Sequence, residues 1–123
     1  MFSWLRRLNL RSRPKTVTIR LASDGFSIIE HDGTPHYLAW VSVKEIFAFK
    51  LDLFTYDTMR LGFRVSDDGT YWQVDEDDVG FCELRAEVER RFDIVDKEWW
   101  TKVAFPAFAT NQTTLWGELW TEP

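Results

Sequence analysis

Apolar and polar residues alternate along the first two thirds of the chain. Between Thr16 and Leu21, for example, Val17 and Ile19 are apolar while the residues beside them are polar or charged. A period of two predicts a strand with one buried side and one side facing solvent. The same criterion predicts six strands, at Thr16–Leu21, Phe26–His31, His36–Val41, Val43–Leu53, Met59–Val65 and Thr70–Val74.

The two longest predicted strands define the expected core. In the fourth strand we expect Phe47, Phe49, Leu51 and Leu53 to share one face, because they occupy every second position. In the fifth strand the apolar set Met59, Leu61, Phe63 and Val65 alternates with Arg60, Gly62 and Arg64. The alternation predicts that the apolar set of the fifth strand faces the core.

Short turn sequences separate most of these strands. Ser23-Asp24-Gly25, Asp32-Gly33-Thr34-Pro35 and Ser66-Asp67-Asp68-Gly69 combine residues that tolerate positive φ with residues that bond to their own backbone. Such turns connect antiparallel neighbours, so an antiparallel sheet is expected.

The periodicity changes after Val74. Phe81, Leu84, Val88 and Phe92 follow one another at helical spacing. This pattern predicts a helix over Val79–Phe92 that lays its apolar side on the sheet. Asp77 and Asp78 precede it, where an N-cap is expected, and Glu87 and Arg91 are placed to pair on its outer face.

These elements predict an α+β fold: a curved antiparallel sheet of five to seven strands capped by a C-terminal helix. The chain of 123 residues has room for one domain, which we place at 16–123. Residues 97–123 form an aromatic-rich extension that includes Trp99, Trp100, Phe105, Phe108, Trp116 and Trp120. We expect most of it to pack on the body, with a short helix over Lys97–Ala104, and we expect Pro106 and Thr110–Thr114 to interrupt regular structure.

Charge is distributed unevenly. Residues 1–20 contain six basic and no acidic side chains, whereas residues 21–123 contain 9 basic and 20 acidic ones, a net charge of −11. An acidic body repels phosphates, which argues against nucleic acid as its partner. Residues 1–15 form a basic leader, which either docks on the body or contacts an anionic membrane surface through residues 1–13.

Candidate catalytic residues are sparse. Cys82 stands at the start of the predicted helix, but we expect a buried structural thiol there. His31 and His36 flank the turn at Asp32 and make an incomplete metal site, so two ordinary surface histidines are the expected interpretation. No GxSxG, HExxH, Walker or GxGxxG pattern occurs. We expect a non-enzymatic protein with no cofactor and no metal.

The expected compartment is the cytoplasm. Cys82 is the only cysteine, so no disulfide can form within the chain. No run of about 18 apolar residues is present, and the first residues lack the pattern of a secretory signal.

Acidic residues crowd at two places and suggest a contact surface. Asp67 and Asp68 stand in one hairpin turn, and Asp75, Glu76, Asp77 and Asp78 stand in the corner between the sixth strand and the helix. One interpretation is that they serve as caps and keep the protein soluble. The other is that they steer a basic protein partner. We select these six acids as the candidate partner-binding residues.

The order of these patterns resembles a known type of domain. Strands joined by Asp-Gly turns, a long strand in Trp40–Lys50 and a following helix resemble small bacterial domains of the pleckstrin-homology-like kind, over about residues 16–92. The tail Trp99–Trp116 resembles that of small bacterial immunity proteins, the partners of secreted toxins. The resemblance implies a non-enzymatic protein that binds and blocks one toxin. The acidity of the body adds the expectation that this toxin is basic. The alternative is a peripheral membrane module, although Asp24 and Asp32 stand where lipid-binding members carry Lys and Arg.

Overall fold

Seven strands form two antiparallel sheets in the computed structural model, which describes residues 17–52, 57–104 and 112–118. The first sheet has the order β1-β2-β3 and the second β6-β5-β4-β7. The strands are β1 (Thr18–Leu21), β2 (Gly25–Ile29), β3 (Pro35–Ala39), β4 (Glu45–Asp52), β5 (Asp57–Arg64), β6 (Trp72–Asp75) and β7 (Thr113–Gly117). The helices are η1 (Trp40–Ser42, 3₁₀), α2 (Phe81–Arg91) and α3 (Trp99–Ala104). The α+β class and the antiparallel pairing are confirmed.

The expectation of one continuous sheet is corrected by the chain path after β3. The predicted third strand ends at Ala39, and its last two residues, Trp40 and Val41, enter the turn η1. The Trp40 amide donates to the Asp24 carbonyl oxygen at 2.9 Å, and the Trp40 ring packs 5.0 Å from the Phe26 ring. Burying Trp40 in this way turns the chain out of the first sheet, so β4 begins a second one.

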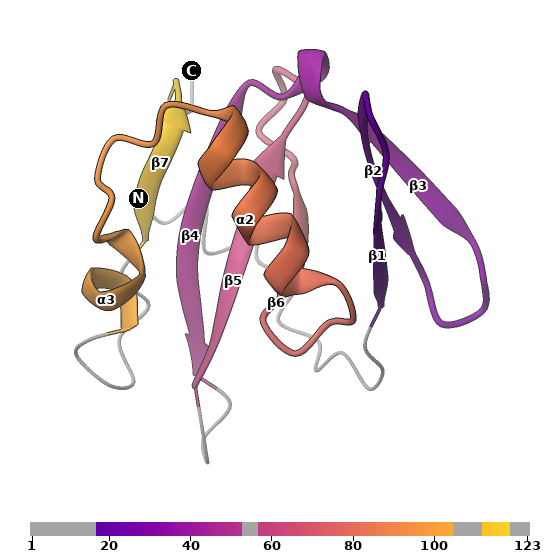
Figure 1. Cartoon of the computed structure of the whole chain (residues 1–123), viewed down its shortest axis with the longest axis horizontal. Helices are drawn as coiled ribbons and strands as arrows, with labels where there is room; N and C mark the ends of the chain where they lie inside the picture. Colours follow the sequence, from indigo (N-terminus) through magenta and orange to yellow (C-terminus); the bar gives the residue numbers. More distant parts are fainter. Residues whose placement is uncertain (1–16, 53–56, 105–111, 119–123) are drawn as a thin grey trace.

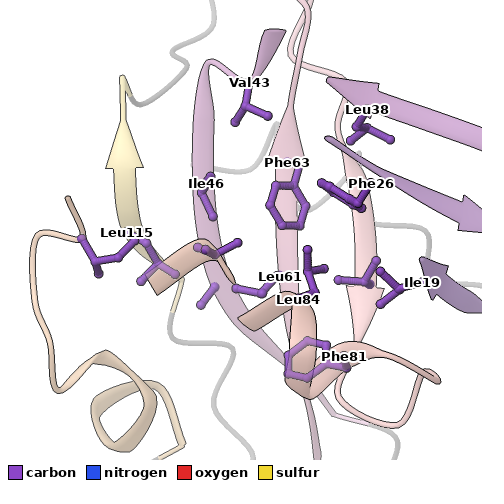
Figure 2. Packing of buried hydrophobic residues seen from close by; sticks show 14 of the residues in the cluster. Ile19, Phe26, Leu38, Val43, Ile46, Leu61, Phe63, Phe81, Leu84 and Leu115 are labelled. Carbon is purple, nitrogen blue, oxygen red and sulfur yellow. The ribbon is translucent and has the colours of Figure 1, made fainter. Parts of the chain in front are cut away.

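The helix α2 covers one face of the four-stranded sheet, and the three-stranded sheet stands beside it (Figure 1). Leu84 and Val88 are buried on that side. The rings of Phe26 and Phe63, from the two sheets, lie 4.9 Å apart at the centre of the core (Figure 2). The predicted helical stripe is therefore confirmed, with helix ends within two residues of Val79–Phe92.

The predicted N-cap of this helix is wrong. The N-cap residue is Gly80, at φ 91°, and no side chain caps the helix. A Cβ at Gly80 would lie 2.3 Å from the Ile19 carbonyl oxygen, so the close approach of β1 requires glycine here. Asp78 has a different role, described below.

The C-terminal extension contains regular structure that the sequence analysis did not predict. β7 pairs antiparallel with β4, so α2 is not the last element of the fold. Thr113 and Thr114, predicted to interrupt regular structure, begin this strand. The predicted short helix at Lys97–Ala104 is confirmed as α3. The leader 1–15, Pro106 and Trp120 lie outside the described residues.

Candidate functional site

The structure separates the six candidate acids by burial. Asp75 is 7% exposed and Asp78 is 4% exposed. The two oxygens of Asp78 accept the backbone N–H groups of Val17 at 3.0 Å and Asp75 at 2.8 Å. Asp78 therefore holds β1 against the end of β6, and it is the fold rather than a partner that engages it.

Asp75 belongs to an ionic cluster on the face of the second sheet opposite α2. Asp75 Oδ2 lies 2.9 Å from Arg60 Nε, and Arg60 Nη1 donates to Gln73 Oε1 at 2.9 Å. On the same face, Arg64 Nε donates to Glu45 Oε1 at 3.1 Å. These arginines and acids are buried. The surface expected to contact a partner therefore loses Asp75 and Asp78.

Aromatic side chains share this second face of the sheet. The rings of Phe47 and Phe49 lie 5.8 Å apart, and Tyr71 packs edge-on against Phe47 at 5.0 Å. Gly62 lies opposite Phe47 in the pairing of β4 with β5, and a Cβ there would lie 2.3 Å from Phe47 Cζ. Phe47 and Phe49 share a face as predicted, but that face is not the main core. The side chains of residues 51–57 are not among those described.

Glu76 is half-buried in the corner between β6 and α2. Its Oε1 accepts the backbone N–H of Met59 at 2.8 Å. Burial, followed by the nearby carboxylates of Asp77 and Asp75, raises the pKa of Glu76 against the lowering effect of that hydrogen bond. Glu76 thus stabilises the β5–β6 ladder rather than presenting a free charge.

The remaining three acids face solvent. Asp67 is 86% exposed at its side chain and pairs with Lys44 at 2.7 Å, which lowers the pKa of Asp67. Asp68 accepts hydrogen bonds from Ser66 and Thr70, and these hold the pKa of Asp68 at about 2. Asp77 is exposed, and its backbone N–H donates to Asp75 Oδ1 at 2.9 Å.

These exposed acids lie at opposite ends of one strand. Asp67 and Asp68 precede β6, and Asp77 follows it. A strand of four residues spans on the order of 13 Å. In the described part of the second sheet β6 is an edge strand, so both acidic ends lie beside that edge.

Trp72, the first residue of β6, was not selected from the sequence as a candidate partner-binding residue. Trp72 is partly exposed to solvent, with 38% of the residue accessible. The His36 ring, on β3, lies 4.8 Å from the Trp72 ring. His36 Nε2 lies 2.7 Å from Glu30 Oε2. The edges of the two sheets thus meet in a Trp72–His36–Glu30 cluster, which no spacing along the chain reveals.

The other candidate chemical groups remain apart. His36 pairs with Glu30 and not with Asp32, whose Oδ1 accepts the Thr34 N–H at 2.9 Å. Among the described residues, no group of three or more His, Cys, Asp or Glu side chains could hold a metal ion. Cys82 is exposed, which corrects the expectation of a buried thiol, because it falls on the outer side of α2.

Comparison with protein-family models, with curated proteins and with solved structures finds no match to this chain. Within the described segments, helices are too short and too polar to cross a membrane. The arguments for function therefore come from the surface itself.

Proposed function

We propose that this chain is a non-enzymatic protein-binding module of the immunity-protein kind, which binds a basic bacterial toxin and occludes its active site. The observation that carries the proposal is the placement of exposed acids at both ends of β6, on a body of net charge −11 over residues 21–123. We further propose that the two sheets and α2 are a pleckstrin-homology-like core to which α3 and β7 are added.

Charge is the main physical support for this proposal. A toxin that acts on nucleic acid needs a basic cleft, and an acidic surface is complementary to such a cleft. Complementary charges accelerate association and disfavour wrong partners. Asp67 and Asp77 are suited to this role because their carboxylates face solvent, whereas the buried Asp75 and Asp78 carboxylates are used within the fold.

The test is a charge reversal on this surface. The partner that co-purifies with the tagged full chain from its native lysate is purified, and its affinity is measured for wild type and for the Asp67→Lys/Asp77→Lys variant. We expect about tenfold weaker binding, mainly through slower association, and a smaller loss of affinity between about 50 and about 300 mM NaCl.

A matched control changes the net charge equally elsewhere. Asp93→Lys/Glu98→Lys alters two exposed acids outside the β6 surface and should leave affinity close to that of wild type. Equal losses in the two variants would show that net charge alone drives binding. A partner that the chain binds without inhibiting it would contradict the neutralising role.

A further inference from the structure

Exposed tryptophan is the feature of this surface that charge alone does not explain. Trp72 is 38% exposed, and it begins the edge strand β6, three residues after the acidic hairpin turn. Tryptophan is strongly enriched among the residues that dominate binding energy at protein interfaces. The surroundings of the ring indicate which chemical group of a partner would bind to it.

The environment of Trp72 is acidic. Glu30 holds the His36 ring against Trp72, and Glu30 itself remains half exposed, with 52% of its side chain open to solvent. Earlier in the chain, Asp68 in the hairpin turn accepts the backbone N–H of Thr70, two residues before Trp72. In the same turn, Asp67 is paired with Lys44. A cation that approaches the Trp72 ring therefore comes near the Glu30 carboxylate, which is held beside the indole through His36.

Other indoles of this protein already carry cations. The guanidinium of Arg85 lies 4.0 Å from the Trp100 ring centroid and 5.1 Å from that of Trp99, and the guanidinium of Arg91 lies 5.2 Å from that of Trp40. Among the described residues, the only ring or cation found against Trp72 is the His36 ring. The electron-rich face of an indole attracts a guanidinium or an ammonium group, more strongly where the pair is removed from water.

We infer that Trp72 is the contact at which this protein receives an arginine or lysine side chain of its basic partner. The inference rests on the proposed function and specifies its central contact. The cation lies against the exposed part of the indole, and the Glu30 carboxylate, held beside the ring through His36, attracts it. His36, tied to Glu30, keeps the ring in place and is a positioning residue.

The experiment uses the full chain and a defined probe, a short peptide of alternating arginine and serine. The indole N–H signal of Trp72 is identified in an NMR spectrum as the signal that is lost in Trp72→Phe. We expect the peptide to shift this signal, and we expect Trp72→Leu to weaken peptide binding about fivefold. Trp72→Phe should retain part of the affinity, and Glu30→Gln should weaken binding about twofold.

Tyr37 provides a matched control on the neighbouring strand. It is 54% exposed, but it lies on the other face of the first sheet, across Gly25 rather than beside Trp72. Tyr37→Leu should bind the peptide as wild type does. A peptide in which citrulline replaces arginine keeps the shape of the side chain and removes its charge, and it should not bind.

Several results would overturn the inference. The inference is wrong if Trp72→Leu binds the peptide as tightly as wild type, if the citrulline peptide binds equally well, or if no peptide binding is detected. It is also wrong if the Trp72 signal moves only with protein concentration, because that would indicate a second copy of the chain as the occupant. If Asp67→Lys/Asp77→Lys weakens binding of the purified partner and Trp72→Leu does not, the Trp72 contact is wrong and the proposed function stands. If the Trp72 variants weaken peptide binding but the purified partner is not inhibited, the proposed function fails and the cation contact stands.

Discussion

Arg60 Nε lies 2.9 Å from Asp75 Oδ2, and each of these side chains is less than 10% exposed. Their strands, β5 and β6, pair so that the two residues are directly opposite each other. The ion pair thus joins the edge strand β6 to the sheet on the face opposite α2.

Removing one partner of this pair should be strongly destabilising. Asp75→Ala leaves the Arg60 guanidinium buried beside an apolar side chain, and the expected loss is about 3–5 kcal/mol of unfolding free energy. Urea denaturation followed by circular dichroism measures it. In Arg60→Met/Asp75→Leu both charges are absent, so part of the stability should return; a double variant no better than the single one would contradict this account.

Leu84 tests the packing of α2. It is fully buried among the core residues of both sheets, so Leu84→Ala should cost about 2–5 kcal/mol. Leu84→Asp should cost more, because it places a carboxylate in an apolar interior. Glu83→Ala, at the adjacent exposed position, should change stability by less than about 0.5 kcal/mol. Similar midpoints for Leu84→Ala and Glu83→Ala in thermal unfolding would show that α2 does not pack as described.

Gly62 tests the second face of the same sheet. A Cβ there would overlap the Phe47 ring, so Gly62→Ala should lose about 1–3 kcal/mol through overpacking. Gly33 is the comparison: at φ 92° it favours glycine, but nothing lies within 4 Å of its Cβ position. Gly33→Ala should therefore cost only about 1 kcal/mol. Chemical denaturation of both variants measures the two losses of unfolding free energy. Equal losses would mean that Phe47 moves aside easily.

Glu76 should produce a pH-dependent difference in stability. Its pKa in the folded protein is raised above the ordinary value of 4.5. A raised carboxyl pKa contributes stability below the unfolded pKa, and this contribution is lost as pH rises through the folded pKa. Glu76→Gln keeps an oxygen for the Met59 N–H, so it should be slightly more stable than wild type at pH 7, and the advantage should vanish below about pH 4.

The stability contributed by Asp68 should depend on pH in the opposite direction to that of Glu76. Its pKa is lowered from 3.8 to about 2, so its contribution is present above the unfolded pKa and is lost as pH falls through about 2. Asp68→Asn should be less stable than wild type at neutral pH, and the difference should shrink below the unfolded pKa. Thermal unfolding at several pH values measures both variants, and the same sign in both would refute the assignment.

Local periodicity was sufficient for most elements. Alternation located β1 to β6 to within a few residues, and helical spacing located α2. These predictions succeed because each strand or helix must bury one side, and the spacing of apolar residues nearby in the chain shows which side that is. β7 was not predicted, because it is short and is stabilised by pairing with β4, far away in the chain.

The candidate site was harder to predict from the sequence than the strands were, because it depends on contacts between segments that are distant in the chain. The sequence alone placed Asp67, Asp68 and Asp77 beside a strand, and their exposure agrees with that placement. Alternation left Arg60 and Arg64 on the face away from the main core, but the structure buries that face as well, with Asp75 and Glu45 as their partners.

What the sequence by itself determined is the type and order of the local elements and the acidity of the body, because hydrophobic spacing and charge are properties of nearby residues. Only the tertiary structure decided that the strands divide into two sheets, that Asp75 and Asp78 turn inward, and that Trp72 meets His36 at the joined edges. These outcomes depend on which distant backbone groups and charges find partners, since a buried carboxylate is stable only where a guanidinium or amide N–H compensates it.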